Sequence, residues 1–264
     1  MNRLLLAGLL ALVSGLTGLA ADKQPQPKSQ KELDAVKAMF EAQTPDARIT
    51  AAENLLLKFA DTEFKAIALY LEAASYEQKN DFEKMVIFAE RTIEADPKNY
   101  ASMLMLAGGI AKRARENDLD LNEKLAQVDK YAKNALDALK DAQKPNPQLP
   151  DEQWVATKKD YIASAHEAYA LSAMLRKKYD VAISEFKQSI EGAATPDPAT
   201  MVRLGQAYNL AGKYDDAIAI LDKVMAGADV HPQIKQFAQA ERVRAIQAKG
   251  AGAKPPAPPA DPKK

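Results

Sequence analysis

The sequence predicts an all-α fold, a solenoid of antiparallel helix pairs, and two observations indicate it. Ala and Leu dominate the apolar residues beyond the N-terminal stretch, and only 6% of the chain is aromatic, a composition that favours helices over strands. One segment also recurs after 35 residues: residues 179–186 have the sequence YDVAISEF, and residues 214–221 have the similar sequence YDDAIAIL. A period of this length is typical of stacked helix pairs.

The expected helices follow one another along residues 31–250, the predicted repeat domain. Apolar residues at helical spacing begin at Leu33, and Asp46 is expected to cap the second helix. An insertion at 117–122 displaces the second helix of the third pair. Three prolines at 144–150 predict a joint within the solenoid before a long helix that begins near Asp151. The closing helix spans Pro232 to Lys249, and its apolar residues are Ile234, Phe237, Ala238, Val243 and Ile246.

The two ends of the chain are predicted to lie outside the repeat domain. Residues 1–20 hold one cation, an apolar run and then small residues, which predicts a signal peptide cleaved between Ala20 and Ala21. Export to the periplasm or the medium follows, with no stable membrane insertion after cleavage. The alternative is an uncleaved helix that anchors the chain to the inner membrane. Residues 21–30 are expected to form a flexible spacer, and residues 251–264, with five prolines, a mobile, disordered tail.

Charge and cysteine content exclude several classes of function. Lys plus Arg equals Asp plus Glu at 36 each, so the chain has no basic field to attract nucleic acid. The chain has no cysteine, which excludes disulfides, thiolate chemistry and a lipid-modified cysteine after the signal.

Small and bulky residues alternate in the repeats as close helix crossings require. Gly205 and Ala217 are small where two helices are expected to cross, and Gly212 is expected to end the first helix in the left-handed conformation. Asn80 takes the place of Gly212 in an earlier copy. The full set of repeat-forming residues is Ala73, Tyr76, Pro97, Ala182, Phe186, Leu204, Gly205, Tyr208, Gly212, Tyr214, Ala217 and Leu221.

This pattern resembles the tetratricopeptide-repeat family, and in particular its exported bacterial members. The resemblance covers about residues 33–250 and implies a right-handed superhelical solenoid of about five helix pairs plus a final helix. In that family a protein or peptide ligand lies in a concave groove lined by the first helices. The corresponding residues here are Ile67, Tyr70, Ala74, Glu77, Glu167, Leu171, Met174, Val202, Gln206 and Asn209.

The resemblance implies a non-catalytic scaffold or adaptor in the periplasm or cell envelope. Two alternatives stay open: a subunit of an outer-membrane or pilus assembly complex, and a regulatory module of an envelope enzyme. Clustered acidic residues on the concave face would favour the enzyme-linked alternative.

No catalytic, cofactor-binding or metal-binding residues are predicted. His166 and His231 have no partner at metal-ligand spacing, and the Ser184–Lys187 pair lacks the motifs that accompany a Ser-Lys nucleophile. Gly108-Gly109 is interpreted as close helix packing rather than a phosphate loop. Trp154, the only tryptophan, is interpreted as a packing residue, with a ligand anchor as the alternative.

Overall fold

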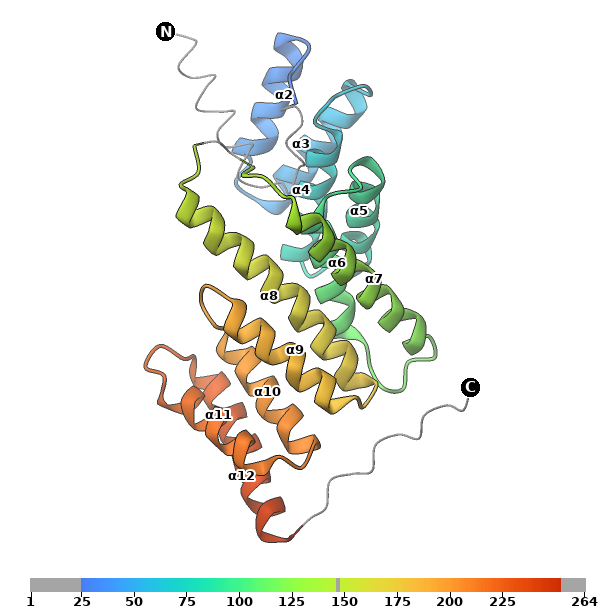
Figure 1. The fold of residues 1–264 in the computed structure, drawn as a ribbon. Coiled ribbons are helices and arrows are strands. Elements are labelled where there is room, and N and C mark those ends of the chain that lie inside the picture. The colour runs from blue at the N-terminus through green and yellow to red at the C-terminus, as the bar shows by residue number, and fades with distance from the viewer. Residues whose placement is uncertain (1–24, 146–147, 253–264) are drawn as a thin grey trace. The chain divides into compact units, whose positions relative to one another are not determined.

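The computed structural model describes residues 25–145 and 148–252, and these form eleven α-helices and no strand (Figure 1). The predicted signal peptide, its cleavage site at Ala20 and Ala21, and residues 253–264 of the predicted tail lie outside the described residues. Within the described part of the chain, no helix is both long and apolar enough to cross a membrane. The helices are α2 (Gln30–Glu41), α3 (Pro45–Lys58), α4 (Lys65–Gln78), α5 (Phe82–Ala95), α6 (Tyr100–Arg113), α7 (Leu121–Lys140), α8 (Asp151–Leu175), α9 (Tyr179–Gly192), α10 (Pro198–Leu210), α11 (Tyr214–Ala226) and α12 (Pro232–Gly250).

The chain forms two compact units. The first, here the N-unit, comprises the described residues up to Gly109 together with those of Lys133–Val155. The second, here the C-unit, comprises Ile110–Ala132 together with the residues from Ala156 onward. Consecutive helices pack on one another within each unit, as α2, α3, α4 and α5 do in the N-unit and α9, α10, α11 and α12 in the C-unit. This is the all-helical pairing that the sequence predicts.

The N-unit core lies between its first three helices. Val36 and Met39 of α2 meet Leu55 of α3 and Ile67 of α4, and each of these side chains is almost completely buried. Trp154, at the start of α8, is 8% exposed, which supports the packing interpretation of this residue.

Hydroxyl and carboxylate side chains cap several of the helix starts. Ser29 caps α2 and Asp81 caps α5 by accepting backbone N–H groups of the first turn. The prediction that Asp46 caps α3 is wrong: Thr44 is the cap, because its Oγ1 accepts the N–H of Ala47 at 3.2 Å and Pro45 follows as the first helical residue. Asp46 lies in the first turn, where its charge suits the helix dipole.

A close crossing organises the C-unit. A Cβ added at Gly205 of α10 would lie 2.7 Å from Cγ and Cδ2 of Leu221 in α11, and Leu221 is fully buried. The predicted need for a small residue here is confirmed. Of the Gly108-Gly109 pair, only Gly109 is closely packed, against Met85; a Cβ at Gly108 would meet nothing within 4 Å.

Three first helices end in the same way. Asn80 after α4, Lys177 after α8 and Gly212 after α10 have φ angles of 57°, 58° and 72°. In each case the next residue donates its N–H to a carbonyl five positions back, at 2.9 Å, the pattern of a left-handed helix stop. The sequence predicts the left-handed conformation of Asn80 and Gly212. It does not predict that of Lys177, whose side chain makes a positive φ less favourable than it is for glycine.

An ion pair also recurs at the length of one repeat. Asp180 in the first turn of α9 pairs with Lys213, 33 residues later, at 2.7 Å. Asp46 of α3 pairs in the same way with Lys79, and Asp215 of α11 with Lys249. Each pair joins the start of a second helix to the end of the next first helix.

The closing helix α12 differs from its prediction. His231 caps it, as a helix-entry residue should. However, α12 buries only Ala238 and Ala245, whereas Phe237, Val243 and Ile246 are 59%, 39% and 44% exposed. The apolar stripe is therefore divided between a buried face of small residues and an exposed face of large ones.

Candidate functional site

The predicted ligand-facing residues of the N-unit lie on α4 at different depths. Ile67 is 1% exposed and belongs to the core, which removes it from any surface that a ligand could contact. Tyr70 is partly buried against the same core, Ala74 is half-buried, and Glu77 is exposed in the last turn. This part of the predicted groove thus reduces to Tyr70, Ala74 and Glu77.

In the C-unit the predicted residues lie on α8 and α10. Leu171 and Met174 are half-buried against the core below them, and Val202 packs partly against the cluster shared with α11 and α12. Gln206 is exposed. Asn209 is already engaged, since its amide donates to the backbone carbonyl of Glu241 in α12 at 2.9 Å and to the Glu241 carboxylate at 3.1 Å.

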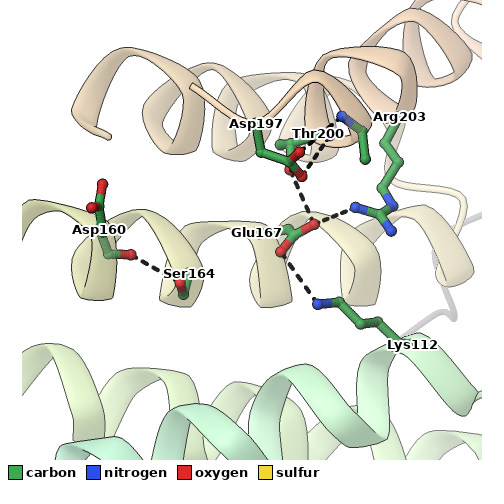
Figure 2. Close-up of polar contacts among 8 residues, drawn as sticks. Lys112, Asp160, Ser164, Glu167, Asp197, Thr200 and Arg203 are labelled. Atoms are coloured by element: carbon green, nitrogen blue, oxygen red, sulfur yellow. Dashed lines mark hydrogen bonds and ion pairs between the residues drawn. The ribbon is translucent and has the colours of Figure 1, made fainter. Parts of the chain in front are cut away.

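The remaining predicted residue, Glu167 of α8, is the centre of a polar network (Figure 2). One carboxylate oxygen, Oε1, accepts a hydrogen bond from Arg203 and lies 3.1 Å from the Thr200 hydroxyl, both on α10. The other, Oε2, lies 3.7 Å from Nζ of Lys112 on α6. The Glu167 side chain is 14% exposed, so three helices hold its charge in a fixed position.

A pocket of about 230 Å³ opens beside this network. Asp160 and Ser164 of α8 line one side, and Asp197 and Thr200 line the other. The chain returning from α9 closes the pocket, because the N–H of Ala194 donates to Asp160 Oδ1 at 2.8 Å. Asp197 caps α10 by accepting the N–H groups of Ala199 and Thr200 at 3.1 and 3.2 Å.

The charged groups of the pocket are already engaged within the fold. Its three carboxylates each have a partner within the fold, and the Glu167 charge is balanced by Arg203 and Lys112. Among residues 25–145 and 148–252, no group of three His, Asp or Glu side chains is arranged to hold a metal ion. A volume of about 230 Å³ is large enough for one polar side chain and too small for a helix. The acidic lining favours a side chain that donates hydrogen bonds.

Sequence reasoning identified Glu167 but missed the residues around it. Lys112 and Arg203 lie 55 and 36 positions away, and nothing local marks them as its partners. His166, adjacent to Glu167, contacts Glu185 of α9 through Nδ1 at 2.8 Å, a contact between paired helices that spacing along one helix does not reveal.

The N-unit also holds a carboxylate without a partner. Glu72 of α4 is completely buried, and neither of its carboxylate oxygens has a hydrogen-bond partner. Burial, together with the Glu53 carboxylate, raises the pKa of Glu72 from 4.5 to about 7, although Arg91 acts in the opposite direction. Glu72 precedes Ala73 as Leu204 precedes Gly205, so a carboxylate occupies a position that leucine fills in another repeat.

Comparisons with known proteins agree with this architecture. A family profile described as "Tetratricopeptide repeat" matches residues 66–99, which cover α5 and all but the first residue of α4. Among solved structures, the chain is similar to a thermophilic TPR protein of Thermus thermophilus, with a TM-score of 0.53 and 18% identity, over 75% of this chain and 91% of that chain. At that identity the likeness shows the fold. No curated protein matches the sequence.

Proposed function

We propose that this chain, which carries a tetratricopeptide repeat at residues 66–99 and the fold of a tetratricopeptide-repeat protein, is a non-catalytic scaffold that binds a protein or peptide along its first helices. Tetratricopeptide repeats suggest protein–protein interaction in general. The observation that carries the more specific proposal is the fixed Glu167 carboxylate beside a pocket of about 230 Å³.

A partner peptide would lie along α8 and α10 and place one donor side chain in the Glu167 pocket. The pocket offers carboxylate acceptors in fixed positions, so little ordering cost accompanies binding. Gln206, exposed on α10, would contact the peptide outside the pocket. Asn209 is left out of this contact set because Glu241 already holds it.

The test is site-specific photo-crosslinking. A photo-reactive residue replaces Gln206 on the first helix α10 or, as the control, Gln188, which is exposed on the second helix α9. Crosslinks to one defined partner from position 206 and not from position 188 are expected. Ser164→Trp, which fills the pocket from its exposed rim, should abolish them. Equal crosslinking from both positions, or no effect of Ser164→Trp, would refute the proposal that the partner binds along α8 and α10.

The proposed location is the periplasm or the cell exterior, and it rests on the sequence of residues 1–20 alone. Fractionation of cells that express the full chain would test it, with the mass of the purified protein reporting cleavage after Ala20. Recovery in the cytoplasm with Met1 intact would contradict export, and recovery with the inner membrane at full mass would favour the anchored alternative.

The pocket also bears on the enzyme-linked alternative, because Asp160, Glu167 and Asp197 bring three carboxylates to one place. Their contacts favour a binding role, since Asp197 is used as a helix cap and Glu167 is paired with two cations. Hydrolysis of an envelope glycan by the purified chain, lost on Glu167→Gln, would instead support an enzymatic role.

A further inference from the structure

Hydrogen-bond donors are scarce around the Glu167 pocket. The Thr200 hydroxyl lies 3.1 Å from Glu167 Oε1 and 3.0 Å from Asp197 Oδ2, but its single hydrogen can serve only one of the two carboxylates at a time. Asp160 adds a third carboxylate, and the described residues that line the pocket include no cation. The two cations paired with Glu167 leave one of the three negative charges unmatched.

Two of the carboxylates keep one oxygen each for a ligand. Asp160 Oδ1 accepts the N–H of Ala194 at 2.8 Å, and none of the described residues donates to its Oδ2. Glu167 Oε1 is held from α10, whereas Oε2 has only the ammonium of Lys112 at 3.7 Å (Figure 2), which is beyond hydrogen-bond length. Both oxygens of Asp197 are taken by the first turn of α10. The pocket therefore offers one free oxygen from each of two carboxylates of α8.

A third acceptor comes from α9 and is independent of the acidic residues. Ser189 lines the pocket and is 6% exposed, yet its hydroxyl makes no hydrogen bond to any other residue in the described part of the chain. A buried hydroxyl without a partner costs free energy, and a ligand that hydrogen-bonds to Ser189 Oγ removes that cost. One cavity is thus lined by three acceptors without a donor: Glu167 Oε2, Asp160 Oδ2 and Ser189 Oγ.

The number and placement of these acceptors match an ammonium group. An ammonium has three N–H donors on one nitrogen and no acceptor, so it can take one acceptor from each of three separate groups. The chain contains a comparable arrangement elsewhere, where Lys124 Nζ lies 2.8 Å from Asp118 Oδ2 and 2.9 Å from Asp120 Oδ1. Each Asp there contributes a single oxygen, which is what Asp160 and Glu167 have to offer in the pocket.

A guanidinium group needs a different set of acceptors. Its planar fork is best satisfied by both oxygens of one carboxylate, and Arg176 places its two terminal nitrogens 3.4 and 2.9 Å from Oδ1 and Oδ2 of Asp129 in this way. No carboxylate among the described lining residues of the pocket has both oxygens free. Ala163 and Ile190 supply an apolar part of the lining, which suits the methylene stem of a lysine side chain.

We infer that the Glu167 pocket binds a primary ammonium group, supplied by a lysine side chain of the partner, through Glu167 Oε2, Asp160 Oδ2 and Ser189 Oγ. The inference rests on the proposed function, because the lysine belongs to a bound partner, and it names the chemistry of the side chain that enters the pocket. Lys112 is then a competitor, since its ammonium lies 3.7 Å from the same Oε2 and its side chain is half-exposed.

A capped pentapeptide with one central lysine, acetyl-Ala-Ala-Lys-Ala-Ala-amide, is the probe. It is titrated into the isotope-labelled full chain, and the backbone amide signals are followed by NMR. Saturable shifts of the Ser189 and Ala194 amides are expected. Replacing the lysine of the peptide by acetyl-lysine, which keeps the stem and removes the charge, or by arginine should weaken binding by about tenfold or more.

Variants of the chain locate the ammonium. Asp160→Asn keeps an oxygen for Ala194 and should weaken binding about tenfold. Ser189→Ala should weaken it about fivefold without lowering the melting temperature, since the hydroxyl has no partner among the described residues. Lys112→Met removes the competitor and should strengthen binding by up to about fivefold. Glu191→Gln is the matched control, because it removes one exposed charge of α9 outside the pocket, and its affinity should be unchanged.

Four results would overturn the inference. The first is the absence of saturable binding of the lysine peptide, and the second is equal affinity for the acetyl-lysine or arginine peptide. The third is an affinity of Asp160→Asn and Ser189→Ala that equals that of Glu191→Gln. The fourth is tighter binding of an alanine pentapeptide with a free N-terminus, which would assign the pocket to a chain terminus instead of a lysine side chain.

The crosslinking experiment separates this inference from the proposed function. Crosslinks from position 206 report whether a partner lies along α8 and α10, whatever side chain enters the pocket. Crosslinks that persist in Asp160→Asn and Ser189→Ala would leave the proposed groove standing and refute the lysine. Binding of the lysine peptide without crosslinks from position 206 would support the ammonium site and refute the groove.

Discussion

Replacing Glu72 by leucine should stabilise the N-unit, and the gain should depend on pH. The carboxylate is fully buried without a hydrogen-bond partner, and its pKa is about 7 instead of 4.5. Folding therefore favours the protonated form. Well below pH 4.5 the carboxyl is protonated in both states and imposes no ionisation penalty. As the pH rises towards 7 the unfolded chain releases the proton first, so the free energy of unfolding falls across this window and is level above it.

The size of the effect follows from the shift in pKa. Each unit of pKa corresponds to about 1.4 kcal/mol, so the ionised Glu72 lowers the stability of the N-unit by at most about 3.5 kcal/mol above pH 7. The Leu variant lacks this term and adds apolar burial at a position where Leu204 is already accommodated in another repeat. Its advantage over the unmodified chain should thus widen by about 2 to 3 kcal/mol between pH 4 and pH 8.

Urea unfolding at the two pH values measures this difference. Trp154 is the only tryptophan, and it is buried in the same unit as Glu72, so its fluorescence follows the unfolding of that unit. Glu72→Gln is the matched control, because it removes the titration while keeping the polar shape. An advantage of the Leu variant that is equal at both pH values would show that the carboxylate ionises in the folded state as it does in the unfolded chain, and would refute the reasoning.

Four further substitutions test backbone, packing and capping features. Lys177→Gly should raise stability by about 1 kcal/mol in urea unfolding, because the residue has a φ of 58°; a loss of stability would contradict the left-handed strain. Gly205→Ala should lower stability by about 1 to 3 kcal/mol, because its Cβ would meet Leu221, while Gly108→Ala, with open space around its Cβ, should raise it by up to about 1 kcal/mol; equal effects of the two would refute the packing argument. Asp197→Ala should cost about 1 kcal/mol in thermal unfolding through loss of the α10 cap, and an unchanged melting temperature would show that the cap is not needed.

Much of the fold follows from local sequence signals. The 35-residue recurrence, the small residue at Gly205 and the left-handed stops at Asn80 and Gly212 predict where helices pair and end. The left-handed stops depend on residues within one turn, and the Gly205 crossing depends on a residue of the same repeat. The Thr44 cap was missed because Asp46 two residues later is an equally good cap by residue type, and only backbone geometry distinguishes them.

The site was less predictable because its contacts join different repeats. Glu167 is a groove position by repeat register, but its partners Lys112 and Arg203 belong to other helices. The burial of Ile67 and the exposure of Val243 likewise depend on which neighbouring helix is present. A helical pattern shows that a face is apolar, and it does not show whether anything covers that face.

The recurring ion pair has a consequence for how the chain folds. Asp46 with Lys79, Asp180 with Lys213 and Asp215 with Lys249 each close a loop of about one repeat, 33 or 34 residues. Each pair is solvent-exposed and contributes little to stability on its own. Because each pair spans only about one repeat, a repeat can become ordered by packing on its neighbour alone. The entropy of closing long loops therefore does not limit the folding rate. Folding can then begin at any helix pair and spread along the chain, and under tension the repeats can open and re-form one after another.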